Sequence, residues 1–270
     1  ANARAEFKRS CRGRKDRLKT KRIREYVILH LKERWSPEQI SIRIKIDLKK
    51  NISHEAIYQF IYNQFNGYEK KQGEDFRMYL RQKRKRRIPN GARRGQRVLK
   101  PYGVSIDDRP TVVERRNPIG DWESDTVESC DHKPGVNTLL ERKTGLYLIT
   151  KVQDKTSVST VRAITERMKG IPEQRKKTMT FDNGPENRDS KLFEENTNIK
   201  SDFAHPYHTW ERGSNENANG LLRDYFPKGT DFSMLSEEEL SKVEHSLNTR
   251  PRKRLGGKTP LEVWGVALQC

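Results

Sequence analysis

The sequence of 270 residues predicts a mixed α/β domain preceded by a small all-α domain. Before residue 80, apolar residues recur at helical spacing, whereas after Gly120 short alternating runs predict strands separated by helices. The charge changes near the same place. Residues 1–110 hold 31 basic and 12 acidic side chains, a difference of +19, and residues 111–270 hold 25 of each. The charge therefore predicts an N-terminal part that binds nucleic acid, joined to an electrically balanced second part; a solubilising basic surface is the alternative.

The composition narrows the class of protein. Only 32% of residues are hydrophobic, no stretch approaches the ~20 apolar residues of a membrane span, and no secretory signal is recognisable. Cys11, Cys130 and Cys270 are isolated, which argues against a zinc module or a disulfide framework. No phosphate-binding GxxxxGK[ST] loop is present, which disfavours an ATP-driven enzyme. We expect a protein of a reducing, intracellular compartment without a membrane partner.

A basic, mobile segment is predicted at residues 1–15, and three helices are predicted within residues 16–80. The first covers about Asp16 to Trp35. Ser36, Pro37 and Gln39 form a capping-box pattern that begins the second helix. Ser53 offers a cap for the third.

Three such helices resemble a helix-turn-helix DNA-binding unit. Its third helix would present His54, Tyr58 and Gln59 to DNA, beside Glu55 and Tyr62. The connection at residues 46–52 is longer than the tight turn of that motif, so a plain three-helix bundle is the alternative.

Residues 81–118 read as a basic linker, since KRKRR and a following Gly- and Arg-rich run lack the apolar residues to fold alone. We expect it to lie along DNA phosphates, and a solvated tether or a localisation signal is the alternative. The candidate phosphate contacts in this linker are Arg84, Arg86, Arg87, Arg93 and Arg94.

Five strands are predicted in the remaining domain, residues 119–270. They are expected at 121–129, 136–144, 146–152, 178–183 and 202–206, with helices at 156–169, 189–196, 214–226 and 236–249. The helix at 156–169 would bury Val158, Val161, Ile164 and Met168 on one face.

Three carboxylates stand out by position in these elements. Asp125 lies within the first strand, Asp182 ends the fourth, and Glu216 lies near the start of a helix. Carboxylates that converge at strand ends repel one another until divalent cations neutralise them, and Mg²⁺ prefers such oxygen ligands. Asp121 and Glu123 share a strand face with Asp125, however, so periodicity does not choose among the three.

Four blocks of sequence carry a family resemblance: GDWESDTV, TFDNGPEN, FAHPYHTWERGSNENANGLLRDYFPKGTDFS and LNTRPRKRLGGKTPLEVW. They resemble the catalytic core of transposases of the insertion-sequence-thirty family, and the similarity extends from about Ser36 to Trp264. These are DDE enzymes with a ribonuclease-H-like fold, related to retroviral integrases. The resemblance implies that Asp125, Asp182 and Glu216 are catalytic and hold two Mg²⁺ or Mn²⁺ ions.

Further DNA contacts are expected near this triad. The Glu216 helix has Arg212, Asn219 and Arg223 on the same face, and both arginines are candidates for phosphate contact or for plain solvent exposure. Arg252 and Arg254 belong to a basic cluster that is a further DNA contact or a structural turn.

We therefore predict a DNA transposase, and the resemblance implies a bacterial protein that is cytoplasmic and associated with the nucleoid. It would bind terminal inverted repeats and target DNA as a homodimer or a higher oligomer, cleave the element's ends, and transfer the freed 3′-hydroxyl to another phosphodiester. The alternatives are a transposase-derived repressor without catalytic activity and a simple nuclease. A histidine-metal relaxase based on His205 and His208 is disfavoured, since neither a third ligand nor a nucleophilic tyrosine can be placed. Family members usually begin with a further helix-turn-helix segment, which this chain is expected to lack or to retain only in part.

Overall fold

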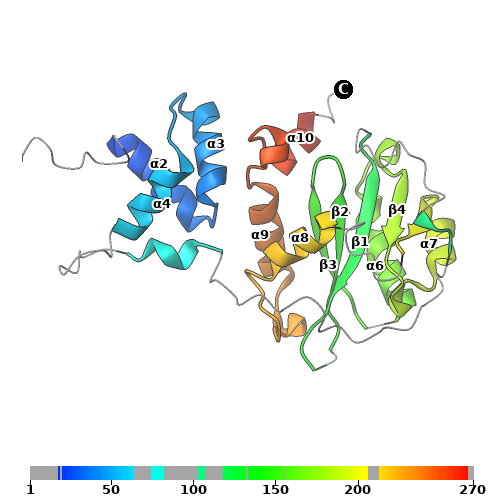
Figure 1. Cartoon of the computed structure of the whole chain (residues 1–270). Helices are drawn as coiled ribbons and strands as arrows, with labels where there is room; N and C mark the ends of the chain where they lie inside the picture. Colours follow the sequence, from blue (N-terminus) through cyan, green and yellow to red (C-terminus); the bar gives the residue numbers. More distant parts are fainter. Residues whose placement is uncertain are drawn as a thin grey trace, which may run out of the picture. The chain divides into compact units, whose positions relative to one another are not determined.

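The computed structural model describes residues 18, 20–63, 74–81, 103–106, 118–131, 133–154, 156–205 and 213–266 (Figure 1). The chain divides into two compact units. One contains the N-terminal helices with residues 250–259, and the other contains the sheet with its helices. Most of the predicted linker, and the segment 1–15, lie outside the described residues.

In the described residues, the first unit contains three α-helices, α2 (Lys21–Lys32), α3 (Pro37–Asp47) and α4 (His54–Asn63). It also contains two short 3-10 helices, η1 (Phe76–Tyr79) and η7 (Lys253–Leu255), the second of which lies in the segment 250–259. Their buried apolar side chains form one core, to which α2 contributes Ile23, Val27 and Leu31. The helix periodicity of the sequence therefore places this core correctly.

Both predicted caps in this unit are present. Ser36 Oγ accepts the Gln39 N–H at 3.3 Å, and Gln39 Oε1 accepts the Ser36 N–H at 2.8 Å, which confirms the capping box of α3. Ser53 Oγ accepts the Ala56 N–H at 3.2 Å at the start of α4. Each bond satisfies a backbone donor that the helix itself leaves without a partner.

Replacing Ser36 by Ala should lower local stability by about 1 kcal/mol, since an N-cap hydroxyl is worth about that much. We expect roughly fivefold faster amide hydrogen exchange in α3, with no change in helix α9 (Glu237–Asn248) of the second unit. Ser236→Ala is the matched control, because Ser236 and Glu239 form the same capping box on α9. Equal effects of both variants on both helices would contradict a local role for the cap.

The second unit is built on a mixed five-stranded sheet. Its strands are β1 (Asp121–Val127), β2 (Val136–Glu141), β3 (Tyr147–Lys151), β4 (Thr178–Phe181) and β5 (Lys200–Phe203). Their order is β3-β2-β1-β4-β5; the first three form an antiparallel meander, and β4 and β5 run parallel to β1. This is the arrangement of a ribonuclease-H-like fold and confirms the predicted fold class of the domain.

Helices cover both faces of the sheet, each with its own apolar core (Figure 1). On one face lie α6 (Ser157–Lys169), α7 (Ser190–Thr197) and α10 (Pro260–Val266), and on the other lie α8 (Gly213–Leu222) and α9. Short 3-10 turns of this unit are η3 (Glu173–Arg175), η4 (Pro185–Asn187) and η6 (Phe232–Met234). No helix within the described ranges is long and apolar enough to cross a membrane.

One of the four residues that were predicted to form the buried apolar face of α6 is exposed. Val161, Ile164 and Met168 are buried, but the Val158 side chain is 58% exposed. At about 100° per residue, Val158 lies at least 60° from the other three, and Thr160 completes the buried face instead.

Candidate active site

The three acidic residues that share a face of β1 have different partners. Asp121 accepts a hydrogen bond from Thr178 Oγ1 at 2.9 Å. Glu123 is fully buried and lies 3.0 Å from Arg142 Nη1 in an ion pair. Asp125, nearer the end of the strand, is only half-buried. The strand therefore leaves Asp125, of these three, accessible for chemistry.

Two donors orient the Asp125 carboxylate. Its Oδ1 accepts the N–H of Thr126 at 3.0 Å, and its Oδ2 accepts a hydrogen bond from Asn219 Nδ2 at 2.6 Å. Asn219 belongs to α8, which packs against β1 and β2. The carboxylate is thus held from its own strand on one side and from a helix on the other.

Asp182 follows β4 directly and lies at the same edge of the sheet. The parallel register pairs Glu123 with Thr180, and two residues further along each strand are Asp125 and Asp182. Neighbouring strands lie ~4.8 Å apart and their paired side chains share a face, so continuing this register directs the two carboxylates to the same edge and face of the sheet. Asp182 Oδ1 accepts hydrogen bonds from the Gly184 N–H at 3.0 Å and from Asn187 Nδ2 at 2.6 Å.

Glu216 lies in the first turn of α8 and its side chain is exposed. Asn219 is three residues further along the same helix, hence on the same side of it. Since Asn219 contacts Asp125, the Glu216 backbone is less than one helical turn from the Asp125 contact. The fold therefore gathers at one end of β1 the three elements that carry the predicted triad.

A fourth carboxylate, Glu186, lies in the turn after Asp182 and was not predicted from the sequence. An added Cβ at Gly184 would lie 2.5 Å from Glu186 Oε2, so this side chain folds back over Gly184. Burial raises the pKa of Glu186, and the charges of Asp182 and Asp125 raise it further. Its position four residues after Asp182, in DNGPE, was the only available signal.

The residues around Asp125 fit a divalent cation in donor type. Two half-buried carboxylates on adjoining strands supply the hard oxygens that Mg²⁺ and Mn²⁺ prefer, and Glu216 has an exposed, rotatable side chain. Within the ranges that the structure describes, no three His, Cys, Asp or Glu side chains converge tightly enough to hold a metal ion. The Glu216 side chain would therefore have to turn toward the two aspartates to complete such a site.

Of the two arginines near the triad that are predicted to contact DNA, the structure describes only Arg223. Arg223 donates to the backbone carbonyls of Glu128 at 2.8 Å and Pro227 at 3.4 Å, and its guanidinium lies 5.7 Å from the Phe232 ring centre. Burial lowers its pKa. These contacts tie loops together, so a phosphate would have to compete with them. Arg212 lies outside the described residues.

Two further arginines belong to the segment 250–259. Arg254 is exposed in η7, whereas Arg252 is half-buried, and burial lowers its pKa to about 10 with a contribution from neighbouring arginines. The candidate linker contacts Arg84, Arg86, Arg87, Arg93 and Arg94 lie outside the described residues.

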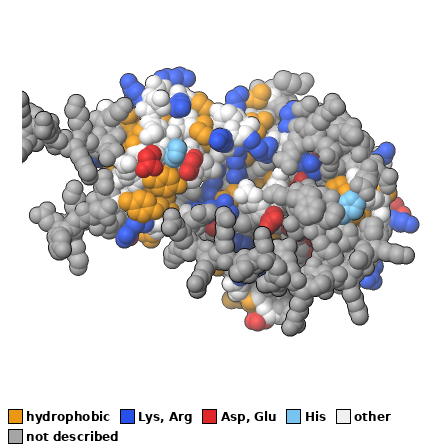
Figure 2. Space-filling model, viewed as in Figure 1, with side chains coloured by type: hydrophobic (Ala, Val, Ile, Leu, Met, Phe, Trp, Pro, Cys, Tyr) orange, Lys and Arg blue, Asp and Glu red, His pale blue; other side chains and the backbone are white. Residues whose placement is uncertain are grey.

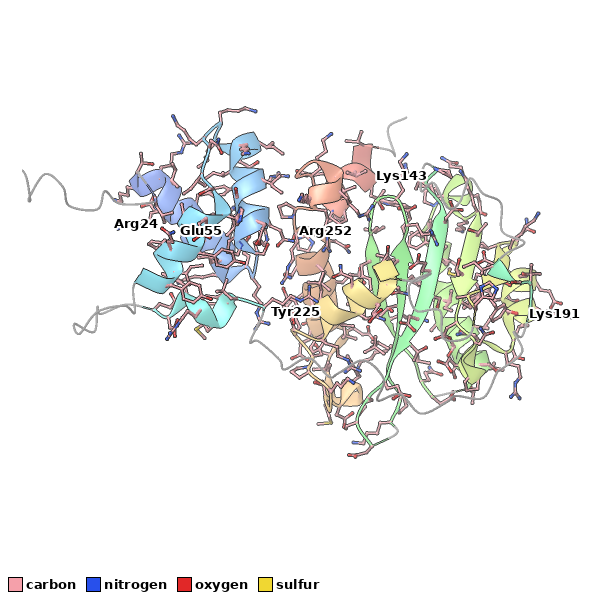
Figure 3. The ribbon with its side chains drawn as sticks, viewed as in Figure 1. Arg24, Glu55, Lys143, Lys191, Tyr225 and Arg252 are labelled. Carbon is pink, nitrogen blue, oxygen red and sulfur yellow. The ribbon has the colours of Figure 1, made fainter. Side chains whose placement is uncertain are left out.

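The face of α4 that was predicted to read DNA is aromatic and partly acidic. His54 is exposed, Tyr58 donates a hydrogen bond to Glu38 at 3.2 Å, and Gln59 donates to Glu55 at 3.0 Å. Figure 2 shows a histidine flanked by acidic side chains above a hydrophobic group on this unit, and Figure 3 labels Glu55 there. These side chains can donate to and accept from base edges, but the visible face is not a dense basic surface.

Comparisons with known proteins show which proteins this chain is similar to. No family model matches it. Among solved structures, the catalytic core domain of BIV integrase superposes with a TM-score of 0.44 at 21% identity, covering 56% of this chain and 96% of that one.

Two curated relatives match far more of the sequence. The transposase for insertion sequence element IS4351 of Bacteroides fragilis is 36% identical over 262 residues, which are 97% of this chain and 78% of that protein. Transposase InsI for insertion sequence element IS30A of Escherichia coli (strain K12) is 35% identical over 254 residues, covering 91% of this chain and 66% of that protein. The chain therefore belongs to the insertion-sequence-thirty (IS30) family of transposases, which are DDE polynucleotidyl transferases.

Proposed function

We propose that this transposase cleaves the ends of an insertion sequence and joins them to target DNA with Asp125, Asp182 and Glu216 as its catalytic residues. The observation that supports the assignment is the parallel β1–β4 register, which directs Asp125 and Asp182 to the same edge of the sheet, where the helix that bears Glu216 packs against β1. The DNA substrates would be the terminal inverted repeats and the target, bound by a homodimer or a higher oligomer.

The chemistry consists of two in-line displacements at phosphorus. Water attacks the phosphodiester at the element's end, the bond to the 3′-oxygen breaks, and that oxygen takes up a proton. The freed 3′-hydroxyl then loses its proton and attacks a target phosphodiester, whose own 3′-oxygen leaves. Two divalent cations, Mg²⁺ or Mn²⁺, would be held by the three carboxylates and would supply activation of the attacking oxygen and stabilisation of the leaving one.

The residues around the three carboxylates would prepare the site to bind cations. The donors on Asp125 and Asp182 fix the orientation of each carboxylate and leave its remaining lone pairs for a cation. The half-buried surroundings strengthen the attraction of these charges for a cation over that in bulk water. The Glu216 side chain is exposed, so it can turn toward the two aspartates and complete the set of cation ligands.

Purified protein with labelled DNA that carries the element's candidate ends tests the proposal. With Mg²⁺ or Mn²⁺ we expect nicked and then joined products, and neither with EDTA. Cleavage without joining would favour a ribonuclease-H-like nuclease. Salt-sensitive binding with neither product, in all metals tested, would contradict a catalytic role for this chain.

The predicted linker contacts should appear in the salt dependence of DNA binding. Each phosphate contact contributes about 0.9 to the slope of log affinity against log salt. Replacing Arg84, Arg86 and Arg87 together by Gln should therefore reduce the slope by roughly 2.7. The measurement is fluorescence anisotropy over a salt series.

The matched control for that series is Lys169→Gln combined with Lys176→Gln. These lysines are already paired with Glu166 and Glu173, each at 2.6 Å. An unchanged slope in the linker variant, or an equal loss in the control, would remove the linker from the DNA interface.

A further inference from the structure

A chain of hydrogen bonds runs from the interior of β3 to the Asp125 carboxylate. The Tyr147 hydroxyl donates to Asn219 Oδ1 at 2.6 Å, and Asn219 Nδ2 donates to Asp125 Oδ2 at 2.6 Å. Thr138, which pairs with Asp125 across β1 and β2, also lies 3.1 Å from Asn219 Oδ1 through its hydroxyl. Three strands and α8 therefore meet at one side-chain amide.

The partners of Asn219 fix the orientation of its amide. Its oxygen faces two hydroxyl groups and its nitrogen faces a carboxylate. In the flipped orientation, the amide oxygen would lie 2.6 Å from a carboxylate oxygen with no hydrogen between them. Hydroxyl donors on the oxygen side hold the amide in the orientation that gives Asp125 a donor.

The surroundings of Tyr147 hold its hydroxyl in place as a hydrogen-bond donor to Asn219. Its side chain is 1% exposed, and the Asn248 side chain of α9 accepts from its N–H at 2.8 Å and donates to its C=O at 2.7 Å. Burial raises the pKa of its hydroxyl, which favours the protonated, donating form.

We infer that Tyr147 is a positioning residue that acts through Asn219 to hold the Asp125 carboxylate in register with the helix carrying Glu216. The inference rests on the proposed function for the use made of that carboxylate. Tyr147 makes no contact with the reacting groups, and its effect is transmitted by the two hydrogen bonds of 2.6 Å. Misorientation of a reacting-site group by a fraction of an ångström is enough to slow a displacement.

Tyr147→Phe removes only the hydroxyl and tests the inference. Tyr225→Phe is the matched control, since the Tyr225 hydroxyl lies 2.6 Å from Ser246 Oγ in the same unit and not in the hydrogen-bond chain. Tyr225 is labelled in Figure 3. Thr138→Val is a second variant in case Tyr147→Phe does not fold; it removes the other hydroxyl near Asn219 Oδ1, together with that hydroxyl's bond to the Asp125 backbone carbonyl.

The first readout is the side-chain amide resonance of Asn219 in protein labelled with ¹⁵N-asparagine, assigned by its loss in Asn219→Ala. We expect Tyr147→Phe to shift this resonance and to accelerate its hydrogen exchange, while Tyr225→Phe leaves both unchanged. The second readout is the joining reaction. We expect about a tenfold lower kcat in Tyr147→Phe with an unchanged KM for DNA, because one hydrogen bond is lost away from the DNA surface.

The two readouts separate the possible failures. An unchanged amide resonance in folded Tyr147→Phe overturns the inference, and so does a changed resonance with an unchanged joining rate. If the wild-type protein joins no DNA, the proposed function fails, and the amide resonance alone still decides whether Tyr147 orients Asn219.

Discussion

Glu216→Gln is expected to abolish both cleavage and joining while leaving DNA binding and folding intact. The side chain is exposed in the first turn of α8, so the substitution removes a charge and no packing. The helix stays anchored through Ala218, Leu221 and Leu222, which are buried in the core. Loss of one carboxylate from the cation site should raise the barrier by about 4 kcal/mol, roughly 10³-fold in rate.

The measurement is the rate of joined product formation in Mg²⁺ and in Mn²⁺, with circular dichroism melting of the same samples. Glu237→Gln is the matched control, because Glu237 is also exposed in the first turn of a helix of the second unit. A Glu216→Gln protein that joins DNA within threefold of the wild-type rate would remove Glu216 from the catalytic residues.

Where a feature depends on nearby residues, the sequence predicted it well. The capping box at Ser36, the cap at Ser53 and the succession of five strands are all present, since each follows from side-chain type and short-range spacing. Family resemblance added the transposase assignment, which the curated relatives confirm. The domain boundaries and the individual site residues stay predictions.

The sequence could not predict which side chains from distant segments contact one another. Strand periodicity placed Asp121, Glu123 and Asp125 on one face, and only the fold shows that Arg142 neutralises Glu123 while Asn219 of α8 orients Asp125. Helical spacing likewise placed Arg223 on the Glu216 side of α8. Its guanidinium contacts backbone carbonyls of two loops, which no local pattern encodes.

The same limit applies to the hydrogen-bond chain. Tyr147 reads as an ordinary strand residue, because tyrosine is common in half-buried strands. Its role arises only where β3, β2 and α8 come together, and Asn219 is 72 residues further along the chain. Positioning residues of this kind are therefore found from tertiary structure.

The ion pair between Glu123 and Arg142 is expected to be the most costly single feature of the second unit to break. Arg142→Met should lower the free energy of unfolding by about 3–5 kcal/mol, since it removes the counterion of a buried carboxylate. The two side chains are 0% and 5% exposed, and Nη1 lies 3.0 Å from Oε1. Amide hydrogen exchange of β1 and β2 under native conditions measures the effect in this unit alone.

Two further variants show whether the charge or the packing causes the loss. Lys143→Met, at the next position and partly exposed, should change stability by less than about 0.5 kcal/mol. Glu123→Leu combined with Arg142→Met should recover most of the lost stability, because replacing both charges by apolar groups leaves no buried charge without its partner. If the double variant is as unstable as Arg142→Met, the cost lies in packing around the arginine. In that case the attraction between the charges of Glu123 and Arg142 would not explain why β1 tolerates a buried Glu123 two residues from Asp125.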